Sequence, residues 1–236
     1  ADSPALAYQG GLGTGRFQAL LSDVTQPLKE TIKGFHNIRW RFQQWDETIA
    51  KDPMGRVAEL KEEISWIESR REQMLNFWKM VEEGVLPMRV THNDTKLSNI
   101  LFNQNGDVLC VIDLDTVMPG YSVNDFGDSI RFGANTAAED ETELDRVSLD
   151  LELFRAYAEG FLAGCDGSLT DTECELLPIG AIMMTLECGM RFLTDYLMGD
   201  VYFKTRRPNQ NLDRCRTQFK LVESIEAQMN KMQALL

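Results

Sequence analysis

The stretch that decides the fold is His92-Asn-Asp-Thr-Lys-Leu-Ser-Asn99, followed without a break by Ile-Leu-Phe-Asn-Gln-Asn-Gly-Asp-Val-Leu-Cys-Val-Ile-Asp up to Asp113. Within it, two apolar runs rich in β-branched residues, 100–102 and 108–112, flank the turn-forming segment 103–107. Such a pattern predicts a β-hairpin. Because a hairpin reverses the chain, we expect it to fold Asp113 back beside Asn99.

A loop and an aspartate arranged in this way supply the groups that phosphoryl transfer needs. The reaction requires a carboxylate beside the attacking hydroxyl and oxygen ligands for the Mg²⁺ that bridges the phosphates of ATP. We therefore expect Asp94 to be the base that orients the acceptor hydroxyl. We expect Asn99 and Asp113 to bind Mg²⁺ and, with it, ATP. The alternative is a turn aspartate, a turn asparagine and a strand-end cap with purely local roles.

Three neighbouring residues belong to the same candidate site. Lys96 either steadies the γ-phosphate as a point charge or is simply solvated. His92 is expected to hold the loop by packing or hydrogen bonding. Asp115, on the predicted strand face of Asp113, is either a further metal ligand or a supporting carboxylate.

The triplet Asp125-Phe-Gly127 lies further along the chain. It spells a known kinase motif, but Asp113 already occupies the position that follows the hairpin. Asp125 and Asp128 stand before a predicted helical run, so we expect them to cap that helix or to support the loop.

The rest of the chain predicts helices. Apolar residues recur at helical spacing over about 56–82 and 149–163, and Thr170 with Glu173 forms a capping box before another helix. A final helix shows Cys215, Phe219, Val222, Met229 and Met232 on one face. The sequence thus predicts an α+β, mainly helical fold with one central hairpin.

Composition narrows the functional class. The chain has 236 residues and a formal net charge of -13, which argues against a nucleic-acid partner because such surfaces cluster Lys and Arg. The five cysteines form no disulfide framework or zinc pattern, which favours a reducing cytoplasm. The longest apolar run, 176–186, is too short to span a bilayer, so no membrane partner is expected.

The chain resembles the aminoglycoside phosphotransferase and choline kinase superfamily, and within it the N-acetylhexosamine 1-kinases. The resemblance is carried by the segments 30–37, 92–102, 111–120, 124–131 and 191–203. It implies that residues 1–236 form a protein-kinase-like C-terminal lobe, which binds substrate and carries the catalytic groups. The N-terminal lobe of a longer enzyme would then be absent, and the isolated lobe would bind ATP poorly.

The glycine-rich stretch Tyr8 to Phe17 raises a separate question. It lacks the flanking strand and the lysine that a phosphate-binding loop requires. The resemblance places it just after the hinge between the lobes. We therefore expect residues 1–22 to be a flexible lead-in to the lobe, with a phosphate cradle as the alternative.

The resemblance also implies a reaction: ATP- and Mg²⁺-dependent phosphorylation of the anomeric hydroxyl of N-acetylglucosamine or N-acetylgalactosamine. It implies sugar contacts from Arg191, Tyr202 and His36. Alternatively, Glu187, Arg191 and Asp195 form an i,i+4 ion-pair ladder and His36 is a packed histidine. Other acceptors remain open, namely aminoglycosides, choline and homoserine, and so does a non-catalytic kinase-like binding module.

Overall fold

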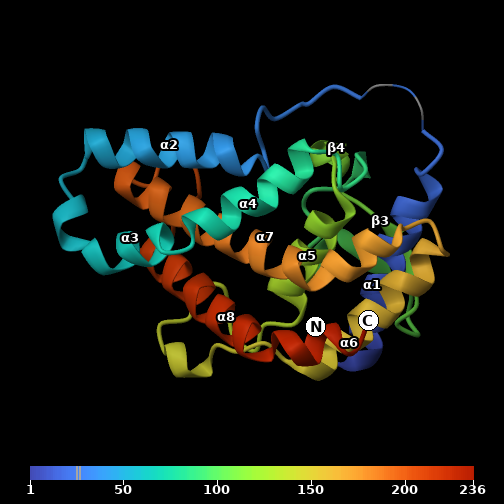
Figure 1. Ribbon diagram of the computed structural model, residues 1–236. Coiled ribbons are helices and arrows are strands. Elements are labelled where there is room, and N and C mark those ends of the chain that lie inside the picture. The colour runs from blue at the N-terminus through green and yellow to red at the C-terminus, as the bar shows by residue number, and fades with distance from the viewer. Residues whose placement is uncertain (25, 27) are drawn as a thin grey trace.

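The computed structural model describes residues 1–236 except residues 25 and 27, and it is mainly helical (Figure 1). Its helices are α1 (Pro4–Leu20), α2 (Ile38–Lys51), α3 (Lys61–Glu68), α4 (Arg71–Glu82), α5 (Ser122–Gly133), α6 (Leu151–Cys165), α7 (Asp171–Met198) and α8 (Gln210–Gln233). Short 3₁₀ turns are η1 (Val57–Glu59), η2 (Leu97–Asn99), η3 (Leu114–Thr116) and η4 (Leu144–Arg146). The predicted α+β, mainly helical class is confirmed.

The strands form two small antiparallel pairs. The predicted hairpin is present: β2 (Ile100–Phe102) pairs with β3 (Val108–Val111), with Ile100 opposite Val111. A second pair, β1 (Arg89–Thr91) with β4 (Met118–Gly120), was not predicted. Strands β1 and β4 lie at the two ends of the segment 92–117, which carries the candidate site, and the β2–β3 hairpin lies inside that segment.

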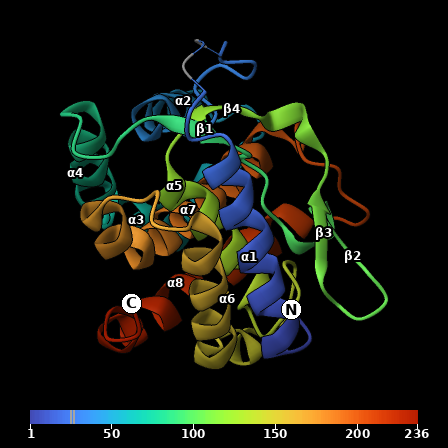
Figure 2. The ribbon, with the colours of Figure 1, turned by 90° about the vertical axis from the view of Figure 1, so that its right-hand side faces the viewer.

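The glycine-rich stretch is neither a flexible lead-in nor a phosphate cradle. It lies inside α1, which begins at Pro4 with Ser3 as its N-cap. The helix runs parallel to α6, and the two lie side by side in Figure 2. Its glycines are therefore part of a helix interface.

The two helices touch through their backbones. A Cβ atom added at Gly11 or Gly15 would come closer than 3.0 Å to main-chain atoms of α6. The same holds in reverse for Gly160 and Gly164, which face main-chain atoms of α1. Both pairs follow a Gly-x-x-x-Gly spacing, which places small residues on one helix face and lets backbones approach closely.

The prediction of one continuous helix over 56–82 is wrong. The chain forms η1, α3 and α4, with a break at Ser69 and Arg70. The Ser69 hydroxyl donates to the carbonyl oxygen of Trp66, a local bond that competes with the helical pattern. Two of the apolar residues at helical spacing in this range, Ile67 and Met74, are nevertheless buried, one on each side of the break.

Helix α7 runs through the middle of the molecule (Figure 1). The predicted capping box of Thr170 and Glu173 is present at its start. The helix is long and apolar enough to cross a membrane, but 83% of its most apolar 18-residue window is buried in the protein. It is thus a core helix, and it packs against α5 and α8.

We predict that Gly11→Ala destabilises the protein by about 3 kcal/mol, because the added methyl group meets the backbone of α6 and forces the helices apart. Urea unfolding measures the effect. The control is Gly133→Ala at the end of α5, where an added Cβ meets nothing within 4 Å. Equal stabilities of the two variants would contradict the proposed contact.

Candidate active site

The segment His92–Asn99, here called the 92–99 loop, connects β1 to β2. Its start is held in an unusual conformation, because Asn93 has a positive φ of 63°. The Asn93 amide donates to the carbonyl oxygens of Thr91 and Thr116, at 3.1 and 3.0 Å. Asparagine tolerates the left-handed region better than most residues, and these bonds retain it there.

The start of the loop is held by hydrogen bonds to Asp125, which is fully buried in α5. Its carboxylate accepts hydrogen bonds from the backbone N–H groups of His92 and Asn93, both at 2.8 Å. It also accepts one from the side chain of Gln18 in α1, at 2.9 Å. Burial raises the pKa of Asp125, and the N–H groups that point at it offset part of this effect.

A second carboxylate on the same helix supports the middle of the loop. Asp128 accepts from the backbone N–H of Thr95 at 3.2 Å and pairs with Arg131 at 2.9 Å. The predicted loop support is therefore confirmed for both aspartates. The predicted capping is wrong, because α5 begins at Ser122 and both residues lie inside it.

His92 is buried and holds the loop through both ring nitrogens. Its Nε2 lies 2.9 Å from the carbonyl oxygen of Ile112, and its Nδ1 lies 3.3 Å from the backbone nitrogen of Asp94. Since the backbone N–H can only donate, Nδ1 accepts and Nε2 donates. The ring also packs edge-on against Phe17 of α1. His92 thus links the loop to the far strand of the hairpin.

Asp94 carries two donors on one oxygen. Its Oδ2 accepts from Lys96 Nζ at 2.8 Å and from Asn99 Nδ2 at 3.0 Å. The Asn99 amide also donates to the Asp94 carbonyl oxygen at 2.9 Å. With both donors on Oδ2, the other carboxylate oxygen of Asp94 and the Asn99 amide oxygen are left to act as acceptors.

Asp113 lies at the same end of the hairpin as Asn99, as predicted, because the Ile112 N–H donates to the Asn99 carbonyl oxygen at 2.8 Å. Asp113 is exposed and has a φ of 62°. The predicted strand face shared with Asp115 is wrong, because β3 ends at Val111 and Asp115 lies in η3. Among the described residues no three His, Cys, Asp or Glu side chains gather together, whereas a Mg²⁺ that is shared with ATP phosphates needs only one or two carboxylates.

A cleft of about 450 Å³ lies beside the loop and brings together residues that are distant in the sequence. Its lining includes Asp94 and Lys96 from the loop, together with His36, Arg191 and Tyr202. All three residues implied as sugar contacts therefore face the same space as the expected base. The expected metal ligands are not in this lining.

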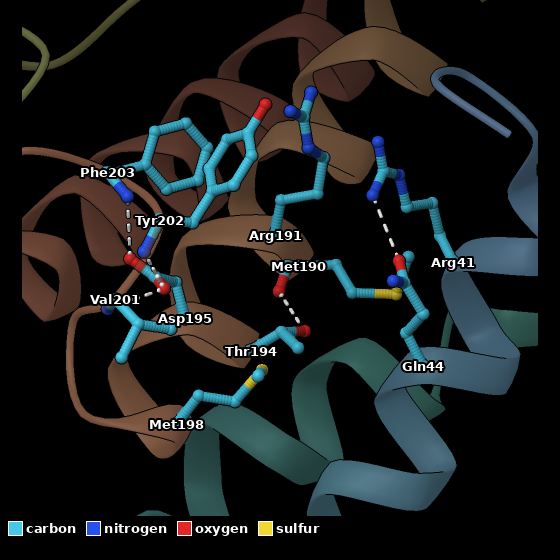
Figure 3. A pocket seen from close by; sticks show the side chains of 10 residues that line it. All are labelled: Arg41, Gln44, Met190, Arg191, Thr194, Asp195, Met198, Val201, Tyr202 and Phe203. Carbon is cyan, nitrogen blue, oxygen red and sulfur yellow. Dashed lines mark hydrogen bonds between the residues drawn. The ribbon is translucent and has the colours of Figure 1, made fainter. Parts of the chain in front are cut away.

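Arg191 and Tyr202 also border a second cavity of about 240 Å³ between α2 and α7 (Figure 3). The predicted ladder holds only in part: Arg191 lies 3.7 Å from Glu187, whereas Asp195 accepts from the backbone N–H groups of residues 201–203. Asp195 thereby shapes the segment that presents Tyr202.

The geometry combines a supported aspartate loop, a hairpin that returns a second aspartate, and an adjacent cleft. The sequence of residues 1–161 matches the phosphotransferase enzyme family, and this match covers well over half of the chain. The chain belongs to the phosphotransferase enzyme family. The predicted class of small-molecule phosphotransferase is thereby confirmed.

The fold of this phosphotransferase is also found in a solved structure. A crystal structure of choline kinase from Cryptosporidium parvum Iowa II superposes with a TM-score of 0.55 at 12% sequence identity. The match covers 97% of this chain and 68% of the choline kinase chain. At this identity the likeness shows a shared kinase-like fold.

Sequence reasoning missed how Glu187 is used in this phosphotransferase. The side chain is 1% exposed and lies among three basic side chains, at 2.9 Å from His36 Nδ1, 3.4 Å from Arg41 Nε and 3.7 Å from Arg191. We call these four residues the Glu187 cluster. The i,i+4 spacing to Arg191 was visible in the sequence, but no pattern indicated that residues 36 and 41 would join them.

We predict that Asp125→Asn costs about 3 kcal/mol of folding stability, since an amide nitrogen would face a backbone N–H that needs an acceptor. Chemical denaturation measures this loss, and amide exchange should report faster opening at His92 and Asn93. Asp145→Asn, at an exposed position, serves as the control. Unchanged exchange at the loop would refute the role of Asp125.

A further prediction concerns how the stability of the protein depends on pH through Glu187. Burial alone would raise the pKa of Glu187, but its basic neighbours, His36 foremost, lower it from 4.5 to about 2. Because the pKa is lower in the folded state, the ionised carboxylate contributes stability above about pH 4.5 and loses it as pH falls toward 2. The unfolding free energies of wild type and Glu187→Gln should differ by about 3 kcal/mol at pH 7 and converge near pH 2. A difference independent of pH would contradict this.

Proposed function

We propose that this phosphotransferase transfers the γ-phosphate of ATP to the anomeric hydroxyl of an N-acetylhexosamine, N-acetylglucosamine or N-acetylgalactosamine. One observation carries the proposal: Asp94 shares its cleft with His36, Arg191 and Tyr202, which the sequence resemblance had implied as sugar contacts. These residues come from the loop, from the segment before α2, from α7 and from the segment after α7.

In this proposal Asp94 is the base. Lys96 and Asn99 hold its Oδ2, so the carboxylate keeps a fixed orientation with Oδ1 available to the acceptor. A base must lie within hydrogen-bond reach of the proton that it removes, and a fixed carboxylate at the cleft wall meets this requirement. Asp94 would orient the sugar hydroxyl for attack and accept its proton.

The residues near the hairpin suit Mg²⁺ and ATP. Asn99 presents an amide oxygen and Asp113 an exposed carboxylate, and magnesium prefers such oxygen ligands. Bound there, Mg²⁺ would neutralise charge on the transferred phosphoryl group. Lys96, half-exposed beside Asp94, is placed to add a positive charge at the same point.

The charge of the cleft favours a neutral acceptor. Although the whole chain is strongly acidic, basic and acidic side chains are nearly balanced in the cleft. The basic ones are Lys96, Arg131, Arg191, Lys204 and Arg214, and the acidic ones are Asp94, Asp128, Glu139 and Glu187. A polycationic aminoglycoside would find no excess of negative charge there to compensate for its lost hydration.

The aromatic rings of the cleft argue against choline in a similar way. Quaternary ammonium groups are recognised by the open faces of aromatic rings. Here the Arg191 guanidinium lies 5.0, 5.8 and 5.5 Å from the ring centres of Phe35, Tyr202 and Phe203. A quaternary ammonium group that approached these rings would therefore be repelled by the positive charge of Arg191.

Arg191 and Tyr202 instead suit a neutral sugar. Within the described part of the chain Arg191 makes no hydrogen bond, so its N–H groups are available to hydroxyl and acetamide oxygens. Tyr202 is 63% exposed and offers both a ring face and a hydroxyl. A hexosamine combines these needs, since its C–H face is apolar and its edges accept hydrogen bonds.

The cellular setting is part of the same proposal. All five cysteines are free, which supports a reducing cytoplasm. The net charge of -13 supports a small-molecule acceptor rather than a nucleic acid.

The test is an assay of the full-length protein with ATP, Mg²⁺ and a panel of N-acetylhexosamines, hexoses, choline, homoserine and aminoglycosides. We expect ADP release that depends on an N-acetylhexosamine and a product that carries phosphate at C1. Turnover of another acceptor in its place would overturn the assignment. Sugar binding without any turnover would favour the non-catalytic binding module.

We predict that Asp94→Asn lowers kcat by at least about 10³-fold in the full-length protein, because the amide cannot accept the proton. Thermal unfolding should stay close to that of wild type, since Asp94 is partly exposed. Asp145→Asn, far along the chain in η4, controls for the loss of a carboxylate. A near-native rate in Asp94→Asn would remove Asp94 from the reaction.

A further inference from the structure

The Glu187 cluster joins three separate parts of the fold around one buried carboxylate. Glu187 is on α7, Arg41 is on α2, and His36 precedes α2. Glu187 Oε2 accepts from His36 Nδ1 at 2.9 Å. Among the described residues, its Oε1 has no hydrogen-bond partner and is flanked by Arg41 and Arg191. Charge rather than hydrogen bonding therefore relates this oxygen to the two arginines.

The two arginines differ in what else they contact. The Arg41 guanidinium donates to the carbonyl oxygen of Phe35 and to the side chain of Gln44. Arg191 donates to no described residue and is held by Glu187 and by the rings around it. In Figure 3 its side chain stands between the Tyr202 ring and Arg41. Removing the charge of Glu187 would therefore release Arg191 far more than Arg41.

His36 carries the influence of the cluster to the 92–99 loop. While Nδ1 faces Glu187, its Nε2 lies 3.4 Å from the carbonyl oxygen of Asn93, the residue before Asp94. The Glu187 carboxylate fixes the ring so that this nitrogen points at the loop. The same carboxylate thus sets the positions of both Arg191 and His36 relative to Asp94.

We propose that Glu187 is the positioning residue of the acceptor site: without touching the acceptor, its buried carboxylate fixes Arg191 and His36 at the cleft beside Asp94. The proposal rests on the proposed function, because it assigns the cleft to the acceptor. Although Glu187 borders the cleft, its side chain is 1% exposed and its Oε1 is buried and flanked by the two arginines, so in this proposal it does not contact the sugar. Its effect must pass through its neighbours.

The lowered pKa of Glu187 is consistent with this arrangement. Burial opposes the ionised form, and the three basic neighbours outweigh it, so the carboxylate stays charged at neutral pH. Two arginines around one carboxylate leave a positive charge at the cleft wall. This charge suits the electron-rich oxygens of a hydroxyl or acetamide group.

The experiment compares Glu187→Gln with wild type in steady-state kinetics of the full-length protein at neutral pH. We expect the KM for the acceptor to rise at least about tenfold, while kcat and the KM for ATP change less than about threefold. This pattern reflects lost binding of the acceptor with the reacting groups intact. Glu187→Asp keeps the charge and should restore part of the lost affinity.

The matched control is Glu173→Gln. Glu173 lies on the same helix, is also 1% exposed, and is paired with Arg89 at 2.6 Å, but it does not line the cleft. We expect it to lose stability comparably and to keep the wild-type KM for the acceptor. The contrast separates positioning of the acceptor site from general support of the fold.

Each outcome is decisive. An unchanged acceptor KM in Glu187→Gln, or an equal rise in Glu173→Gln, overturns the role of Glu187. If Glu187→Gln does not fold, Glu187→Asp decides by the same comparison. Turnover of a different acceptor overturns only the hexosamine assignment, and the comparison is then made with that acceptor. No turnover with any acceptor overturns both proposals.

Discussion

The whole candidate site depends on one buried carboxylate, Asp125. Its two oxygens accept the backbone N–H groups of His92 and Asn93, which begin the 92–99 loop. Buried N–H groups without acceptors are costly, so the observed conformation of the loop depends on this carboxylate. The positions of the later residues depend on where the loop begins. Asp94 follows at the cleft, Asn99 lies at the hairpin, and the hairpin returns the chain to Asp113.

Close helix packing brings this carboxylate to the loop. Gly127 in α5 faces the backbone of Gly180 in α7, and Gly180 faces that of Val123, so these helices also meet main chain to main chain. The parallel contact of α1 with α6 similarly holds Gln18 where it can donate to Asp125. Glycine removes side-chain bulk at each contact. The precision of the site thus rests on residues that have no side chain.

The sequence predicted what depends on local chemistry. The hairpin, the capping box of Thr170 and the position of Asp113 relative to Asn99 follow from turn residues and short-range pairing. Tertiary context decided the rest. The glycines near Gly11 favoured a loop when the sequence was considered alone, and only the contact with Gly160 on α6 explains them as a helix interface. The Glu187 cluster joins elements that no local sequence pattern relates. The break after Ile67 is accompanied by a local hydrogen bond of Ser69, which apolar spacing does not reveal.

The contact between α1 and α6 has a consequence for how the protein is made. Helix α1 packs mainly against α6, which follows it much later in the chain, so α1 cannot dock there until α6 has been made. The bond from Gln18 to Asp125 closes a separation of 107 residues. Non-local closures of this kind slow folding. We therefore expect the 92–99 loop to become ordered only after the distant segments that carry Gln18 and Asp125 have met.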